Sequence, residues 1–225
     1  EESNFSEKAE NLGNAINSTT HDYIPQISPD GTTLYYTRVG HPENLGPEKY
    51  HNVWYSKRVN NKWDVAQKMP EPINNEVPNF LYNITPDGNT ILLGDSYDEE
   101  VYLSEIGVTT SKKTKDGWSQ PERAIIENLH SQSQYNEFFL AANKKVMLMS
   151  LDRLEGEGAN DIYVSFLKVD NTWNEPKNIG KTVNTANIET APFLAADNKT
   201  LYFSSNGHRG YGDKDIFVST RLDDS

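Results

Sequence analysis

An internal repeat of about 55 residues constrains the fold of this chain more than any other feature. A turn motif occurs four times, and its third residue, at Asp30, Asp87, Asn143 and Asp197, recurs at steps of 57, 56 and 54 residues. Two further markers follow the same period: a serine that closes a strand-like run (Ser56, Ser111, Ser165 and Ser219) and an aromatic residue (Phe5, Trp63, Trp118 and Trp173). Three markers with one period and one order indicate a repeat architecture.

Each unit contains four strand-sized runs separated by turn residues. In the first unit these runs are 23–28, 33–37, 53–58 and 63–67. Pro29-Asp30-Gly31 predicts a tight turn between the first two runs, because Pro presets φ, Asp bonds to nearby backbone and Gly accepts a positive φ. The aspartates of these turns are therefore expected to cap the turn and to have no chemical role. Four short antiparallel strands per unit, repeated radially, predict an all-β fold, the β-propeller.

The four units divide the chain into one domain, 1–225, with four blades of four antiparallel strands. The expected blades are about 19–68, 76–124, 131–178 and 186–225. The last unit stops after its third run, whereas the stretch 4–12 resembles the fourth run and exit of the third unit at 172–180. We expect the N-terminal strand to complete the last blade and close the ring, because this pairing removes a free sheet edge.

The charge balance excludes several classes of partner. The chain has 33 acidic and 21 basic residues, for a net charge of −12, so it repels phosphate backbones and anionic lipid. Nucleic-acid binding is therefore not expected, and neither is direct membrane insertion, because no apolar run has the length of a membrane span. The absence of cysteine excludes disulfides, thiolate metal sites and a cysteine nucleophile.

The repeat motifs resemble those of TolB-type, WD-like β-propellers of the bacterial cell envelope. The matching segments are Leu201-Tyr202-Phe203-Ser204, Asp161-Ile162-Tyr163-Val164-Ser165, Asp215-Ile216-Phe217-Val218-Ser219 and the pairs Trp118/Pro121 and Trp173/Pro176. The resemblance implies a docking domain on the periplasmic or extracellular face of the envelope, after removal of a leader that this chain does not contain. The chain also departs from that family in one respect, because propellers of that family usually have more than four blades. We expect a monomeric domain.

Alignment of the units on the turn motif places one equivalent position near the start of each first strand: Asp22, Asn79, Tyr135 and Glu189. In a propeller this end of the innermost strand lies on the face that carries the loops between second and third strands, so these residues are expected to ring the mouth of the central channel. The loops themselves differ in length and sequence, which is typical of binding loops on a rigid frame. They supply the other candidate contact residues, His51, Asp95, Asp98, Asp152, Arg153, His208 and Arg209.

The favoured function is a non-catalytic binding module that holds a protein or glycan partner at this loop face and channel mouth. The alternative is a carbohydrate-active hydrolase or lyase that uses Asp22 and Glu189 as a carboxylate pair. No catalytic residue is assigned and no cofactor is expected. A structural Ca²⁺ in the channel remains open, because Asp22, Asn79 and Glu189 are oxygen donors.

Overall fold

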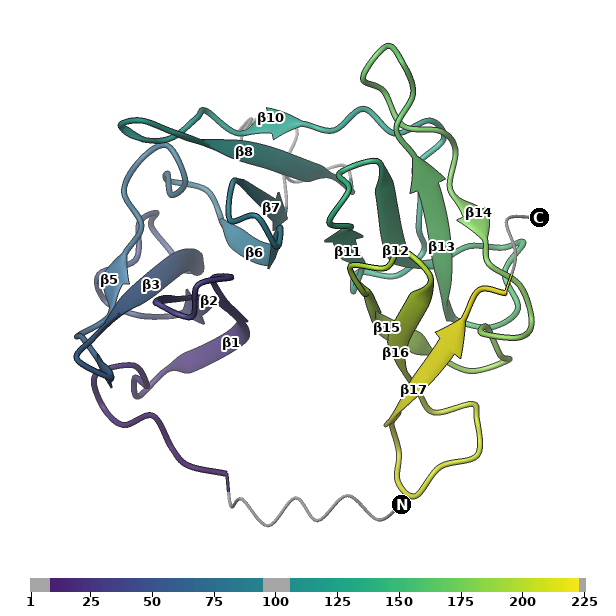
Figure 1. Cartoon of the computed structure of the whole chain (residues 1–225), viewed down its shortest axis with the longest axis horizontal. Coiled ribbons are helices and arrows are strands. Elements are labelled where there is room, and N and C mark those ends of the chain that lie inside the picture. Colours follow the sequence, from purple (N-terminus) through teal and green to yellow (C-terminus); the bar gives the residue numbers. More distant parts are fainter. Residues whose placement is uncertain (1–8, 95–105, 223–225) are drawn as a thin grey trace.

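The computed structural model describes residues 9–94 and 106–222, and every regular element in these ranges is a β-strand. Four antiparallel sheets lie side by side around a common axis, with the first strand of each sheet innermost (Figure 1). The predicted all-β propeller of four blades is confirmed.

Each blade follows the chain outward from the axis. Blade 1 consists of β1 (His21–Ile27), β2 (Thr33–Val39), β3 (His51–Val59), β4 (Lys62–Trp63) and β5 (Gln67–Lys68). Blade 2 consists of β6 (Phe80–Ile84), β7 (Thr90–Gly94), β8 (Val108–Thr114), β9 (Gly117–Trp118) and β10 (Glu122–Arg123). Blade 3 consists of β11 (Glu137–Leu140), β12 (Val146–Asp152), β13 (Asn160–Phe166) and β14 (Lys177–Asn178). Blade 4 consists of β15 (Glu189–Leu194), β16 (Thr200–Ser205) and β17 (Asp215–Thr220).

The turns between first and second strands explain one repeat marker. Asp30 accepts hydrogen bonds from the Ser28 hydroxyl at 2.6 Å and the Thr32 amide at 2.9 Å. These bonds lower the pKa of Asp30 to about 2, because they favour the charged carboxylate. Asp87 and Asp197 make equivalent bonds to the amides of Asn89 and Lys199. The prediction that these aspartates cap turns is confirmed.

The recurring serine has an equally local role. The Ser56 hydroxyl donates to the Asp64 carbonyl at 2.6 Å, directly after Trp63. Ser111 and Ser165 donate in the same way to the carbonyls of Ser119 and Asn174, at 2.6 and 2.5 Å. Each serine therefore ties the outermost segment of a blade to the third strand.

The fourth run of blade 1 differs from its prediction. It was expected as one strand over 63–67, but two short strands occupy this region, β4 on the far end of β3 and β5 beside the middle of β3. The carbonyl between them, at Asp64, accepts from the Ser56 side chain. A side chain thus replaces part of the backbone ladder here.

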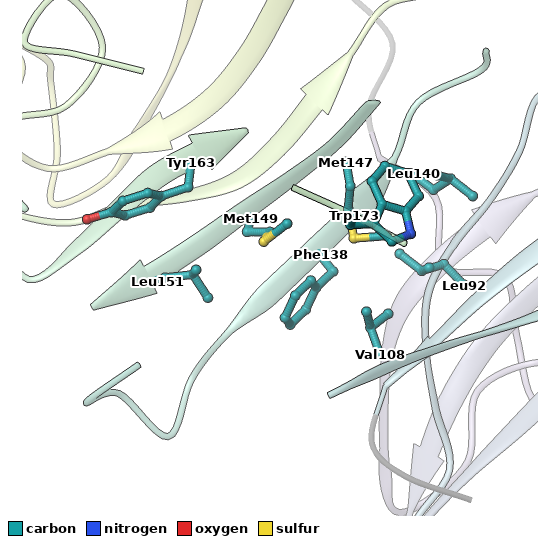
Figure 2. Packing of buried hydrophobic residues seen from close by; sticks show 9 residues of the cluster. All are labelled: Leu92, Val108, Phe138, Leu140, Met147, Met149, Leu151, Tyr163 and Trp173. Atoms are coloured by element: carbon teal, nitrogen blue, oxygen red, sulfur yellow. The ribbon is translucent and has the colours of Figure 1, made fainter. Parts of the chain in front are cut away.

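Neighbouring blades are joined by apolar clusters. Leu92 and Val108 of blade 2 share a buried cluster with Phe138, Met147 and Trp173 of blade 3 (Figure 2). A second cluster joins blades 1 and 2, and a third joins blades 3 and 4. The core of the molecule is therefore a series of interfaces between sheets.

Polar side chains also cross between inner strands. The Asn83 side chain on β6 donates to the Leu140 carbonyl on β11 and accepts from the Leu140 amide, both at 3.0 Å. Asn83 is buried, so this pair of bonds fixes the position of one blade relative to the next in a site without water competition.

We expect Asn83→Ala to lower the free energy of unfolding by about 2–4 kcal/mol, because it leaves a buried amide and a buried carbonyl of Leu140 without partners. Urea denaturation measures this change. Lys145→Ala, at an exposed position beside a turn of blade 3, is the control and should change stability by less than about 1 kcal/mol. Equal stability of the two variants would contradict a linking role for Asn83.

Blade 4 has three strands in the described part of the chain, and the outer edge of β17 pairs with none of the described residues. The predicted closing strand, 4–12, lies outside the described residues over 4–8, and 9–12 form no strand. On the face of blade 4, Ile216 and Val218 are 81% and 61% exposed. These are unusual values for apolar residues within a sheet.

The repeat shows which buried residues of the other blades are equivalent to these exposed side chains. In the interface of blades 3 and 4, Leu148, Ile162 and Val164 pack with Val183, Leu201 and Phe203. Their repeat equivalents are Tyr202, Ile216 and Val218 on blade 4 and Ile16, Leu34 and Tyr36 on blade 1. The second set forms a buried cluster of its own at the free face of blade 1. Blade 4 and blade 1 thus carry the two complementary halves of a further interface between blades.

We expect Glu10 to pair with Val218 when the ring closes, because Glu10 precedes Gly13 by three residues as Lys177 precedes Gly180, and Lys177 pairs with Val164, the repeat equivalent of Val218. A protein carrying Glu10→Cys and Val218→Cys should form an intramolecular disulfide under mild oxidation, detected by non-reducing electrophoresis and mass spectrometry. The chain has no other cysteine to interfere. A pair of Glu10→Cys with Val169→Cys, on blade 3, should stay monomeric and reduced, and equal cross-linking of both pairs would contradict closure.

Candidate functional site

The four equivalent residues at the start of the inner strands have a shared structural role in three blades. Asp22, Asn79 and Glu189 each accept a hydrogen bond at 2.8 Å from the backbone amide four residues earlier, at Ser18, Asn75 and Thr185 respectively. This bond closes the turn through which the chain enters each inner strand.

Burial corrects the expectation that this set rings an accessible channel mouth. Asn79 and Glu189 are both 0% exposed, and Glu189 also accepts from the hydroxyls of Thr185 and Ser205 at 2.7 and 2.6 Å. Asp22 forms an ion pair with the buried Arg38 at 2.6 Å. Tyr135 differs from the other three, since its side chain is 84% exposed.

The same contacts bear on the carboxylate pair of the alternative hydrolase or lyase. A glycosidase needs two carboxylates that face one substrate-sized space. Glu189 is enclosed by hydroxyl donors in blade 4, and Asp22 is held by Arg38 in blade 1. In the described structure these two groups do not form a shared open site.

The remaining loop residues are dispersed. Arg153 was expected as an exposed contact residue, but it is buried. It pairs with Glu155 at 2.5 Å and with Glu175 at 3.2 Å, so its guanidinium stabilises the blade 3 loop. The His208 ring lies between Phe203 and Phe217, with Nε2 2.8 Å from the Val183 carbonyl oxygen. Asp152 is half-buried at the end of β12, and Arg209 is exposed on the blade 4 loop. Asp95 and Asp98 lie outside the described residues.

Two predicted residues, His51 and Tyr135, do come together at a cavity of ≈ 650 Å³ between the inner strands of blades 1, 2 and 3. Its lining comes from the starts of these strands and from the segment before β8: Tyr23, Ile24, His51, Phe80, Tyr82, Ile106, Gly107, Gln134, Tyr135, Asn136 and Glu137. We call this the mouth cavity. A second space of ≈ 250 Å³, shared by all four inner strands, meets the mouth cavity at Ile24, Tyr82 and Glu137.

A chain of aromatic contacts forms one wall of the mouth cavity. The His51 ring lies 5.8 Å from Tyr23 and 5.7 Å from Phe80, and Phe80 lies 5.1 Å from Tyr82. Tyr82 continues the chain to Phe138 at 5.3 Å. The Tyr23–His51 and Phe80–Tyr82 contacts are edge-to-face and the other two are tilted, and such contacts favour fixed ring orientations, so the wall is preorganised.

The polar groups of the mouth cavity include both hydrogen-bond donors and acceptors. Burial lowers the pKa of His51, so the ring is neutral at pH 7, and burial raises the pKa of Tyr23 to about 12. The buried atoms His51 Nδ1 and Asn136 Oδ1 have no hydrogen-bond partner among the described residues. The Glu137 carboxylate accepts from the Ala191 amide and is the one acidic group that the described residues contribute to the lining.

Backbone strain accompanies the inner strands. Ile24 and Ala191 occupy equivalent positions and have φ values of 52° and 51°, at points where the registers of β1 and β15 shift. A β-branched residue at positive φ costs on the order of 1–3 kcal/mol, and such strain concentrates at functional positions. Each bulge turns the following side chains relative to a regular strand.

Sequence reasoning missed most of the mouth cavity. Tyr23, Phe80 and Tyr82 are aromatic residues on predicted strands, and Glu137 sits at the repeat position of Ile24 and Ala191. The available signal was aromatic residues that follow Asp22 and Asn79 directly, in strands expected to face the channel.

Within residues 9–94 and 106–222, no group of three or more His, Cys, Asp or Glu side chains is placed to hold a metal ion. The same residues contain no helix with the length and apolar character needed to cross a membrane.

We expect Glu189→Ala to destabilise the fold by about 2–4 kcal/mol, because it leaves the half-buried Thr185 amide and the buried Ser205 hydroxyl without an acceptor. Thermal and urea unfolding measure the change, with Glu122→Ala, an exposed carboxylate on β10, as the control. Unchanged stability together with weaker partner binding would instead restore Glu189 as a contact residue.

Comparisons with known proteins identify the fold. No family model and no curated protein matches the chain. TolB from Acinetobacter baumannii is similar in structure, with a TM-score of 0.57 and 14% sequence identity over 92% of this chain and 42% of that one. The β-propeller domain of the Trilobed protease from Pyrococcus furiosus, described as having an open velcro topology, aligns with a TM-score of 0.45 and 7% identity over 90% of this chain and 56% of that one. The chain thus spans less than two thirds of either protein, and its fold is that of a TolB-like β-propeller.

Proposed function

We propose that this protein is a non-catalytic binding module of a bacterial cell envelope, which holds a partner at the mouth cavity. The observation that carries the proposal is the cavity of ≈ 650 Å³ at the channel mouth, which is lined by a row of contacting aromatic rings and by the Glu137 carboxylate. Concave, mostly apolar sites with a few convergent polar groups are typical of binding sites.

The rigid frame favours binding. Inner strands of three blades contribute to the mouth cavity, so its shape is set by the same interfaces that hold the blades together. The polar groups that seemed suited to catalysis, Asp22 and Glu189, have structural partners. A partner can dock on this preorganised surface at a low cost in conformational entropy.

The envelope location is supported by the likeness to TolB and by the repeat motifs that resemble envelope propellers. The net charge of −12 is consistent with a partner that is not a nucleic acid. The partner in this proposal is a protein, because propellers present loop faces of a size suited to protein surfaces, and a glycan is the competing outcome of the experiment below.

The test blocks the mouth cavity from its rim. Gln134 is exposed and lines the cavity, so Gln134→Trp should fill the entrance without disturbing the fold. The immobilised wild-type protein should capture a partner from bacterial envelope extract, identified by mass spectrometry, and Gln134→Trp should reduce the capture at least about tenfold.

The matched control is Gln132→Trp, an exposed position two residues earlier that is not part of the cavity lining. It should capture the partner like wild type. Equal capture by all three proteins would place the binding surface elsewhere, and no captured protein or glycan in any extract would overturn the proposed function.

A further inference from the structure

The mouth cavity has a chemical preference that its shape alone does not reveal. Among the described residues, its lining contains one carboxylate, Glu137, and no lysine or arginine. The two buried polar atoms without described partners are Asn136 Oδ1, an acceptor, and His51 Nδ1. Because the Asn136 amide nitrogen already donates to the Ser133 carbonyl at 2.9 Å, its oxygen is the group left to be satisfied.

Buried polar atoms need partners: Asn136 Oδ1 lacks a hydrogen-bond donor, and His51 Nδ1 lacks a donor or an acceptor according to the tautomer of its ring. Asn136 Oδ1 and the Glu137 carboxylate accept hydrogen bonds and do not donate them, and neutral His51 accepts through one ring nitrogen. A ligand with an acidic group would find no cation in the lining, and it would face Glu137.

The aromatic wall selects further among donors. Tyr23, Phe80 and Tyr82 present aromatic rings to the same cavity that holds Glu137. The faces of these rings attract cations through their quadrupoles, and the rings provide apolar surface for a hydrocarbon chain. An alkylammonium group has both properties, since its three N–H donors are carried on a hydrocarbon stem.

We propose that the mouth cavity binds an alkylammonium group, in the form of a lysine side chain presented by the partner, which places its charge beside Glu137 and its stem against Phe80 and Tyr82. The inference rests on the proposed function, because it names the part of the partner that enters the cavity. The net charge of −12 assists it by attracting cationic surfaces during approach.

The direct test is an NMR titration of the ¹⁵N-labelled protein with Nα-acetyl-lysine methylamide. Saturable shifts at residues of the mouth cavity are expected, with a Kd of about 1 mM, as suits a single side chain. The Nε-acetylated form of the same compound, which has lost the charge, and chitobiose, a neutral sugar, should bind at least about tenfold more weakly.

Two variants test the assigned contacts. Glu137→Gln removes the charge and keeps an oxygen that can accept from the Ala191 amide, and Phe80→Leu removes the ring face while keeping apolar volume. Each should weaken binding of the lysine compound about five- to tenfold. The matched controls, Glu122→Gln on β10 and Phe166→Leu on β13, lie outside the cavity and should leave binding unchanged.

A final experiment distinguishes a lysine of the partner from a free amine. It also distinguishes failure of this inference from failure of the proposed function. Acetylation of lysines in the envelope extract should abolish partner capture, whereas added free alkylamine at low concentration should compete only weakly. Capture that survives acetylation, or tighter binding of chitobiose than of the lysine compound, overturns the inference and leaves the proposed function standing. Failure of all ligands together with failure of capture overturns both.

Discussion

Apolar packing between neighbouring sheets is the interaction on which the rest of this structure depends. An isolated four-stranded sheet cannot bury either of its faces, so each blade requires a neighbour on both sides. Leu92 and Val108 meet the Phe138 and Trp173 side of blade 3, and Leu148 and Ile162 on the opposite side of blade 3 meet blade 4. Blade 4, where Ile216 and Val218 stay exposed, shows what the requirement means for a blade face that no described residue covers.

The same packing creates the candidate site. The sheets behind the inner strands and crossing bonds such as Asn83 to Leu140 fix the inner strands of neighbouring blades relative to one another. Bulges at Ile24 and Ala191 interrupt the alternation of those strands at the channel. Aromatic rings and an isolated carboxylate thus line one cavity because rigid sheets hold bulged strands close together.

Most of the fold could be predicted from the repeat in the sequence. Ser56, Ser111 and Ser165 were found as periodic markers, and the structure adds the reason, since each hydroxyl holds the segment after a tryptophan. The equivalence of Asp22, Asn79 and Glu189 was also read correctly, but their role was not. Each accepts a hydrogen bond from an amide four residues earlier. These periodic polar residues therefore stabilise a turn that recurs in each repeat, and this role accounts for their period without a ligand.

The sequence by itself determined the number of units, the order of strands and the turn chemistry, because these depend on local spacing and on residues close in the chain. Only the tertiary structure decided which side chains are accessible and which meet. The mouth cavity brings together residues from three blades, Tyr23, His51, Phe80 and Glu137. Asn79 and Glu189, in contrast, are buried inside blades 2 and 4. Burial and convergence follow from the relative positions of the sheets, and side-chain packing across the interfaces sets those positions.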